Sequence, residues 1–258
     1  KSLMVSRLAA PVPKYWSPAD WDMILTSTPA YKTFFELNGI PTYINHNGFD
    51  KRIINELRDG AKLNDVIFVG GLGNGVWSKR TKCVEFLSDK VNFKWWGYNN
   101  TDYPAEHPVM KSWQGLTSGL EMLQLYKQSK IVFNDYGEIA EGMAVNQRMF
   151  EVMGVGSLLL TREVPNLKKD FPENIFITFK DEKDCLDKIN YYIANQRERQ
   201  EIAAAGQKFI LANFSYEKLM KELDAILKER YKKKFSNGMS KTVYFYAQTQ
   251  AILGLFLL

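Results

Sequence analysis

Three residues that could act together on a ligand lie near the middle of the chain: Asn146, Arg148 and Glu151. The local pattern predicts a strand that ends near Asn134, then a polar loop, then a helix that begins at about Asn146. Asparagine is a favoured N-cap, and the N–H groups behind it attract an anion such as phosphate. Arg148 and Glu151 are three residues apart and share one helix face. This arrangement suits a phosphate beside a ribose diol; the alternative is a plain surface ion pair.

A second candidate is the glycine-rich segment Phe68–Arg80, which is expected to join a strand to a helix. Gly70 and Gly71 would let backbone N–H groups approach an anion, and Lys79 and Arg80 would add positive charge at the helix start. The segment lacks the G-K-[ST] of a P-loop and the third glycine of the dinucleotide fingerprint. A glycine-rich turn without a ligand therefore remains an alternative.

A third candidate is Tyr98, which follows a short aromatic strand and a glycine. At a strand end it could border a base or a sugar. Aromatic residues at such positions more often belong to the core, and this alternative stays open.

Metal and hydrolase chemistry find no support in the sequence. His46 and His107 lack suitably spaced ligand partners, and neither Cys83 nor Cys185 belongs to a C-x-x-C pair. G-x-S-x-G and H-E-x-x-H motifs are absent. Two cysteines so far apart favour a reducing compartment over a disulfide framework.

Composition describes a globular chain. Its 258 residues are 45% hydrophobic and 24% charged, which excludes a disordered or collagen-like protein. At roughly 150 residues per domain, one or two domains are expected. The net charge of +5 is too small and scattered for nucleic-acid binding. The sequence begins with Lys1 rather than Met, so we expect a fragment or a processed product.

Short apolar segments alternate with amphipathic ones, which predicts an α/β fold with doubly wound parallel sheets. The predicted strands are Leu3–Leu8, Met23–Thr26, Thr42–Ile44, Val66–Val69, Phe93–Trp96, Ile131–Asn134, Ser157–Thr161 and Ile175–Phe179. The predicted helices are Ala30–Leu37, Arg80–Leu87, Leu120–Gln128, Gln147–Met153, Cys185–Asn195, Arg197–Asn213 and Tyr216–Lys233.

We expect a domain boundary near residues 47–50. Residues 1–47 form too few units for a free-standing domain and are interpreted as the truncated part of one Rossmann-like domain. Residues 48–234 are interpreted as a complete second domain. Residues 235–258 break the pattern: their apolar part, from Thr242, is too short and polar for a membrane span. A helix packed on a missing domain, or an artefact of the chain end, is expected there rather than an anchor.

The segment Asn146–Thr161 resembles the N-x-R-x-F-E-x-x-x-x-G-x-x-L-L-T signature of bacterial group-1 glycosyltransferases, and most closely the spore-maturation-protein (CgeB-like) branch. The resemblance covers roughly Asp22 to Leu227. It extends to Leu125–Asn134, Pro165–Phe171, Ile189–Ile193, Arg199–Gln207 and Phe214–Tyr216. It implies a GT-B architecture of two Rossmann-like domains, with the nucleotide sugar bound mainly by the C-terminal one.

Transferred by position, the resemblance implies that Glu151 holds the donor ribose hydroxyls and that Asn146–Arg148 meet the diphosphate. Arg80 and the Gly70-Gly71 turn would help to neutralise it. Many relatives carry a second, sugar-contacting glutamate eight positions before the first; that position is Met143 here, and the nearest acid is Glu141. The resemblance also implies that much of the acceptor-binding domain, and any general base with it, lies outside this chain.

The sequence thus predicts a hexosyltransferase-type enzyme that moves a sugar from a nucleotide-diphosphate donor, with a UDP-sugar favoured, to a glycan or other acceptor. No metal or cofactor is expected, and retention of stereochemistry is favoured by the resemblance. The expected role is cell-surface or spore polysaccharide synthesis in the cytoplasm, with the inner face of the membrane as an alternative. The main competing hypothesis is a non-catalytic nucleotide- or sugar-binding module of a larger assembly protein. A dinucleotide-dependent oxidoreductase is disfavoured by the missing fingerprint.

Overall fold

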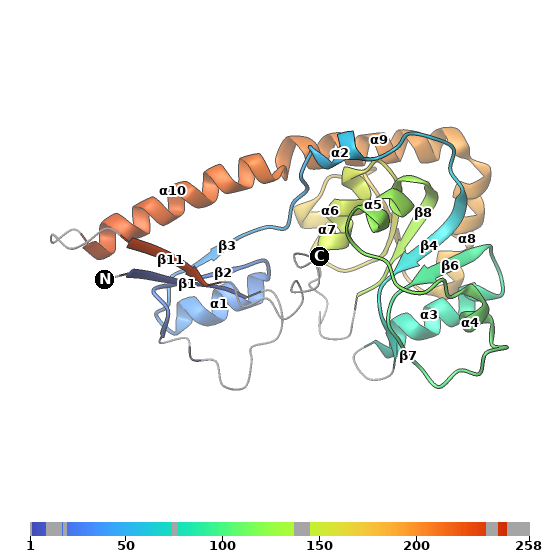
Figure 1. Cartoon of the computed structure of the whole chain (residues 1–258), viewed down its shortest axis with the longest axis horizontal. Coiled ribbons are helices and arrows are strands. Elements are labelled where there is room, and N and C mark those ends of the chain that lie inside the picture. Colours follow the sequence, from blue (N-terminus) through green and yellow to red (C-terminus); the bar gives the residue numbers. More distant parts are fainter. Residues whose placement is uncertain are drawn as a thin grey trace. The chain divides into compact units, whose positions relative to one another are not determined.

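The structure is a computed structural model that describes residues 2–8, 17, 20–73, 77–136, 145–235 and 242–246. The chain divides into two compact units. Unit 1 consists of residues Lys1–Asn47 and Tyr216–Leu258, and unit 2 of residues Gly48–Ser215. Figure 1 labels most of the helices and strands of both units.

Unit 2 is built on a five-stranded sheet with the strand order β10-β9-β8-β4-β6. All of its strand pairs are parallel. Consecutive parallel strands need crossover connections, and helices supply most of these. The strands are β4 (Asn64–Val69), β6 (Phe93–Trp96), β8 (Ser129–Asn134), β9 (Leu158–Arg162) and β10 (Ile177–Phe179).

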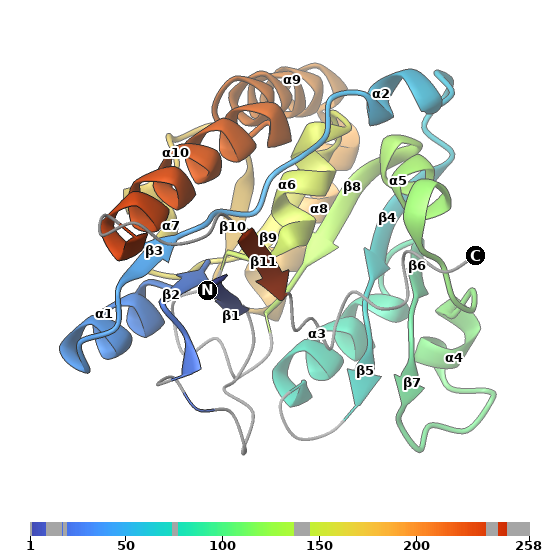
Figure 2. The ribbon, with the colours of Figure 1, turned by 60° about the vertical axis from the view of Figure 1, so that its left-hand side comes forward.

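Helices cover both faces of this sheet (Figure 2). Side chains alternate along a strand, so Ile67 faces one core and its neighbours Val66 and Phe68 face the other. The first core includes residues of α5, α6, α7 and α9, and the second includes residues of α3, α4, α8 and α9. The helices are α3 (Ser78–Ser88), α4 (Pro108–Ser112), α5 (Gly119–Lys127), α6 (Gln147–Gly154), α7 (Leu167–Asp170), α8 (Glu182–Ala194) and α9 (Gln196–Asn213). The predicted α/β class with parallel sheets is confirmed.

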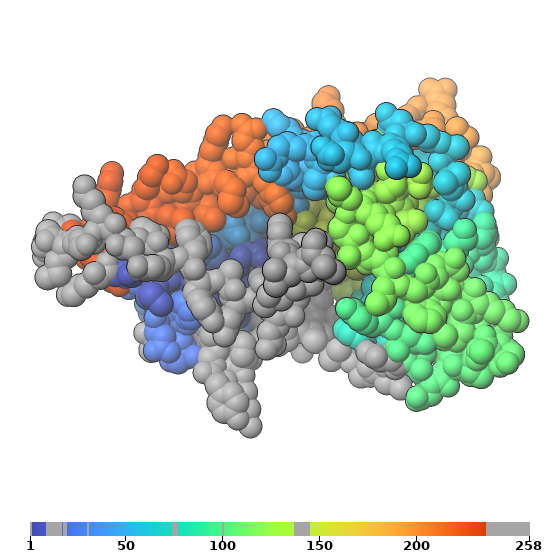
Figure 3. Space-filling view, in the orientation of Figure 1, coloured from blue at the N-terminus to red at the C-terminus, as the bar shows by residue number. Residues whose placement is uncertain are grey.

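Short elements complete unit 2. The helix α2 (Ile53–Glu56) leads into a segment that lies against α5, where Arg58 N–H donates to Gln124 Oε1 at 2.8 Å and Gln124 Nε2 returns a bond to the Arg58 carbonyl. Figure 3 shows this cyan segment beside the green of α5. The strands β5 (Leu72–Gly73) and β7 (Asn99–Asn100) form a separate two-stranded parallel pair.

Unit 1 contains a four-stranded parallel sheet with the order β11-β1-β2-β3. Its strands are β1 (Ser2–Leu8), β2 (Met23–Thr26), β3 (Thr42–Ile44) and β11 (Thr242–Tyr246), and its helices are α1 (Pro29–Leu37) and α10 (Tyr216–Phe235). Apolar residues of α10 pack on Leu3, Val5, Met23 and Leu25. Leu8, Ile24 and Phe35 form a second small core.

Two features differ from the sequence-based expectation. The expected helix in the tail is wrong for residues 242–246, which form β11 and extend the sheet of unit 1. Their run of β-branched and aromatic residues favours a strand. In addition, residues 48–234 were expected to form one domain, whereas α10 belongs to unit 1 because its apolar face packs on that sheet. Among the described residues, no helix combines the length and hydrophobicity that crossing a bilayer requires.

Candidate functional site

The predicted site residues of unit 2 gather where parallel strands end. Gly70 directly follows β4, Gly97 directly follows β6, and α6 begins a dozen residues after β8 ends at Asn134. Because β4 lies between β6 and β8, these three carboxyl ends are neighbours. Ligands of open α/β sheets bind at this edge.

Arg80 is buried beside the glycine-rich turn, with 7% of its surface exposed. Its guanidinium donates from Nη2 to the Gly71 carbonyl. It also lies 5.4 Å from the ring centroid of Phe68 and 5.1 Å from that of Trp77. These contacts hold a permanent positive charge at the end of β4.

Arg148 brings a second guanidinium to the same place from the first turn of α6. Its Nε donates to the Tyr126 hydroxyl at 3.2 Å, and its Nη1 lies 3.5 Å from Asn134 Oδ1. The guanidinium is 5.5 Å from the centroid of the Phe68 ring. A Cβ atom at Gly70 would lie 2.6 Å from that ring and 3.4 Å from Arg148 Nη2, so only glycine leaves the space this arrangement needs. The structure therefore brings together Gly70, Gly71, Arg80 and Arg148.

The glycine-rich turn presents fewer N–H groups than the sequence suggested. Gly70 N–H donates to the Trp96 carbonyl at 2.8 Å, Leu72 N–H to the Tyr98 carbonyl at 2.9 Å, and Gly73 N–H to Thr81 Oγ1 at 3.0 Å. These bonds join the end of β4 to β6 and α3, so the expectation that Gly70 offers its N–H to an anion is wrong. Gly71 N–H has no acceptor within the described residues.

Asn146 occupies the N-cap position of α6, but its side chain makes no capping hydrogen bond. Its Nδ2 donates instead to Asn134 Oδ1 at 2.9 Å, because the carboxyl end of β8 lies beside the helix start. The buried Asn146 Oδ1 has no partner in the described part of the chain. Met149 N–H donates to the Asn146 carbonyl at 3.2 Å, and the dipole of α6 still favours an anion near its first turn.

Glu151 is half-buried on α6, one turn beyond Arg148. Burial raises the pKa of its carboxyl, and the charge of Arg148 and a hydrogen bond from Gln147 oppose part of that rise. The two residues form no ion pair with each other; Arg148 reaches toward Tyr126, and burial raises the pKa of that hydroxyl to about 12. The alternative of a simple surface ion pair between Arg148 and Glu151 is therefore not what this structure contains.

Tyr98 lies beside the same turn, with 68% of its surface exposed. Its backbone carbonyl receives the Leu72 N–H, while its side chain is outside the core. Gly97 has a φ of +148°, and a Cβ atom there would lie 2.1 Å from the Gly70 carbonyl oxygen. Because its side chain is exposed, Tyr98 is not a core residue, and that alternative is excluded. Glu141 and Met143 lie outside the described residues.

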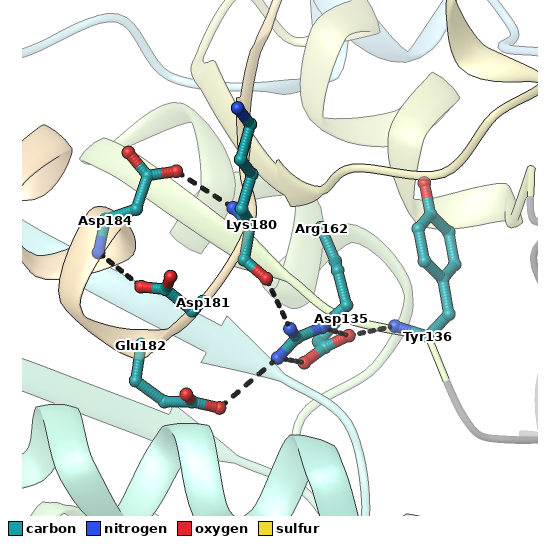
Figure 4. A network of polar contacts seen from close by, with 7 residues as sticks. All are labelled: Asp135, Tyr136, Arg162, Lys180, Asp181, Glu182 and Asp184. Atoms are coloured by element: carbon teal, nitrogen blue, oxygen red, sulfur yellow. Dashed lines mark hydrogen bonds and ion pairs between the residues drawn. The ribbon is translucent and has the colours of Figure 1, made fainter.

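A buried ion pair that the sequence reasoning missed joins the ends of β8 and β9. Asp135 is 1% exposed, and its two carboxylate oxygens accept hydrogen bonds from Arg162 Nε and Nη2, each at 2.8 Å. Figure 4 shows Arg162 reaching also to the Lys180 carbonyl, at 3.2 Å, and to Glu182, at 3.7 Å. The pair fastens these strand ends to the start of α8.

The Asp135 carboxylate also belongs to the electrostatics of the candidate site. Burial raises the pKa of Asp135, and the charges of Arg162 and, more weakly, Arg80 oppose this rise. The sequence held part of the signal, because Asp135 and Arg162 each lie one residue beyond a predicted strand.

The arrangement therefore consists of two fixed guanidiniums, a backbone N–H, a helix start and a half-buried carboxylate. Such a set can hold a polyanion near a group with vicinal hydroxyls. In the described part of the chain, no three His, Cys, Asp or Glu side chains are grouped so that they could hold a metal ion.

A family model described as glycosyl transferase-like matches residues 80–225, which include α3, β8, α6 and the predicted signature. This match covers more than half of the chain. The chain belongs to the glycosyl transferase-like family. No curated protein sequence matches it.

Solved structures share the fold at low sequence identity. HepE of Anabaena, crystallised with UDP-glucose, is 14% identical with a TM-score of 0.62, over 87% of this chain and 72% of HepE. A glycosyltransferase of Rickettsia africae is 13% identical with a TM-score of 0.61, over 88% and 70% of the two chains. Sucrose-phosphate synthase of Thermosynechococcus elongatus is 11% identical with a TM-score of 0.59, over 82% and 59%. The chain thus has the fold of GT-B glycosyltransferases.

Proposed function

We propose that this protein binds a nucleotide-diphosphate sugar at the carboxyl edge of unit 2 and transfers the sugar to a glycan or other acceptor. The single observation that carries the proposal is the placement of Arg80 and Arg148 on one aromatic ring, 5.4 and 5.5 Å from the centroid of Phe68. Two like charges at the same strand end repel each other, and a diphosphate bound there would relieve the repulsion.

Each part of the donor has a partner in this proposal. The diphosphate would contact Arg80, Arg148, Gly71 N–H and the start of α6 at Asn146. The ribose hydroxyls would donate to Glu151, and the base or sugar would border Tyr98, with Glu141 as the nearest acid for the transferred sugar. A UDP-sugar is the favoured donor, which the complex of HepE with UDP-glucose supports by analogy of fold.

The chemistry follows from these placements. Transfer breaks the bond between the anomeric carbon and the diphosphate oxygen, and the diphosphate leaves with the electron pair. A bond forms between the anomeric carbon and an acceptor hydroxyl oxygen, which loses its proton to a base or to solvent. Fixed positive groups that meet this growing charge lower the barrier, since they need no reorganisation during the reaction. We propose that the reaction uses no metal or other cofactor.

The finer assignments rest on the signature at Asn146–Thr161. We propose that the chain belongs to the spore-maturation-protein (CgeB-like) branch and transfers a hexosyl group. The role proposed is cell-surface or spore polysaccharide synthesis in the cytoplasm or at the inner membrane face.

Nucleotide binding tests the proposal first. The melting temperature of the full chain is measured with increasing UDP, GDP, ADP, CMP and NAD. A ligand that binds only the folded state raises it in proportion to the logarithm of its concentration. We expect a rise with a nucleoside diphosphate and none with NAD. A rise with NAD alone, or none with any diphosphate, would refute the proposal.

Catalysis is tested by the release of UDP from UDP-glucose in the presence of candidate glycans. Release that requires an acceptor supports a transferase. The same assay is run on a longer chain that also carries the acceptor-binding domain. If that chain binds UDP but releases none from UDP-glucose with any acceptor, the competing hypothesis of a non-catalytic binding module is favoured.

A further inference from the structure

Unit 1 has its own positively charged group at the carboxyl edge of its sheet. Arg7 is the penultimate residue of β1, and its Nε donates to Asn45 Oδ1 at 3.0 Å. Its Nη2 donates to Asn47 Oδ1 at 3.1 Å. Asn45 and Asn47 follow the end of β3, so the guanidinium extends from the end of one strand to residues beyond another. Two neutral amides therefore fix its position.

No carboxylate of the described residues pairs with this guanidinium. The contrast within unit 1 is clear, because Lys234 pairs with Asp22 and Lys32 pairs with Glu36 at 2.5 Å. Arg7 is also half-buried, and burial lowers its pKa from the ordinary value. A cation that is withdrawn from water without a counter-charge is unfavourable unless a ligand supplies one.

The remaining donors have a geometry that suits an oxyanion. Arginine carries five N–H donors in a planar fork, and the amides of Asn45 and Asn47 use two of them. The other three, on Nη1 and Nη2, can donate in pairs to two oxygens of one phosphate or carboxylate. Because two side chains already hold the fork, little conformational freedom is lost on binding.

We propose that Arg7, held by Asn45 and Asn47, binds the phosphate or carboxylate group of a ligand at the carboxyl edge of unit 1. The position agrees with the general rule that ligands of parallel sheets bind beyond the strand ends. The identity of the ligand rests on the proposed function: if the protein is a glycosyltransferase, the ligand is a sugar acceptor that carries a negative charge.

The test follows the NMR signal of the Arg7 side chain itself, in the full chain. The Nε–H resonance of Arg7 in a ¹H–¹⁵N NMR spectrum is identified by its loss in Arg7→Lys. It is then titrated with inorganic phosphate, glucose 6-phosphate, glucuronate and, as a neutral control, glucose. We expect a saturable shift with at least one of the anions and none with glucose. Tighter binding of glucose 6-phosphate assigns a phosphate group to the ligand, and tighter binding of glucuronate assigns a carboxylate.

A variant that keeps the arginine makes the test specific. Asn45→Asp places a carboxylate against Arg7 Nε, so an internal charge competes with the ligand. We expect anion affinity to fall about tenfold or more, the size of one charge-assisted hydrogen bond. Lys32→Gln, which removes an exposed cation of the same unit, should leave the affinity unchanged. No saturable shift with any anion, or equal affinity in Asn45→Asp and wild type, would overturn the inference.

Titration of the same samples with UDP separates the two proposals. Loss of the anion response in Asn45→Asp with UDP binding intact supports the Arg7 site. Anion binding at Arg7 in a protein that binds no nucleoside diphosphate would refute the donor proposal and leave the anion site standing, without its assignment to an acceptor.

Discussion

Arg80 and Arg148 lie against the same aromatic ring, although 67 residues separate them in the sequence. Arg80 comes from α3, which follows β4, and Arg148 from α6, which follows β8. Since β4 and β8 are paired neighbours, the two helices that follow them in the chain place their arginines at one edge of the sheet. The Phe68 ring attracts both cations and offsets part of their mutual repulsion.

This relationship predicts that Arg80 recognises the diphosphate rather than the nucleoside. In Arg80→Gln the dissociation constant for UDP should rise about tenfold or more, and that for UMP should rise much less. Calorimetric titration with both ligands gives the ratio of the two dissociation constants, which does not depend on a general loss of stability. The exposed Arg197→Gln on α9 serves as the control. Equal losses for UDP and UMP would remove Arg80 from the diphosphate site.

The contact of Gly97 with Gly70 should be needed for the shape of the site. In Gly97→Ala the new Cβ meets the Gly70 carbonyl at 2.1 Å, so the turn must move. Gly115→Ala is a matched control because Gly115 also has a positive φ, of +89°, but a Cβ there meets nothing within 4 Å. Both variants should lose about 1 kcal/mol or more of stability from backbone strain. Only Gly97→Ala should also bind UDP more weakly; comparable UDP affinities in the two variants would contradict this account.

The ion pair of Asp135 with Arg162 should contribute to stability far more than a surface pair. Asp135→Asn leaves a partly buried guanidinium without its nearest counter-charge and with Glu182 only at 3.7 Å, which should lower the free energy of unfolding by about 3 kcal/mol. Asp65→Asn, which breaks the more exposed pair with Lys130, should lower it by about 1 kcal/mol or less. Urea unfolding of both variants checks the difference. Equal losses of unfolding free energy in the two variants would show that the buried pair stabilises the fold no more than the exposed one.

Lys62 predicts a pH dependence at the opposite edge of the unit 2 sheet. Burial, together with the charges of Arg199 and Lys127, lowers the pKa of Lys62 from 10.5 to about 8. Between these values the unfolded chain holds the proton and the folded chain does not, so the free energy of unfolding should rise with pH. The rise should be of order 1–3 kcal/mol and absent in Lys62→Met. Urea denaturation at pH 7.5 and pH 10 measures the free energy of unfolding of wild type and Lys62→Met. The same change with pH in both proteins would contradict the lowered pKa of Lys62.

Much of the fold was predictable from the sequence because its strands are short apolar runs and its helices are amphipathic. The strand Phe93–Trp96 has the predicted bounds, and the helix α6 differs from its prediction by one residue. The membership of α10 in unit 1 was not predictable, because the apolar face of a helix does not indicate which of two sheets it packs on. The strand β11 was missed because an uncharged apolar tail was interpreted by its length rather than by its β-branched and aromatic content.

The site was predictable only where a residue type and its position carried the information. Spacing placed Arg148 and Glu151 on one helix, but it could not show that Arg148 turns away toward Tyr126. Nor could it show that Gly70 serves as space for Phe68 while its N–H donates to the Trp96 carbonyl rather than to an anion. Asp135 and Arg162 were missed because their pairing depends on the adjacency of β8 and β9, which only the sheet order reveals.

The proposed contact of Glu151 with the donor ribose is tested by removing the hydroxyl groups that it would bind. Calorimetry compares UDP with its 2′,3′-dideoxy analogue in wild type and in Glu151→Gln. We predict that wild type prefers UDP by about tenfold or more, the size of hydrogen bonds to a charged acceptor, and that Glu151→Gln loses most of this preference while its unfolding midpoint changes little. An undiminished preference in Glu151→Gln, or equal affinities of wild type for the two ligands, would contradict the account.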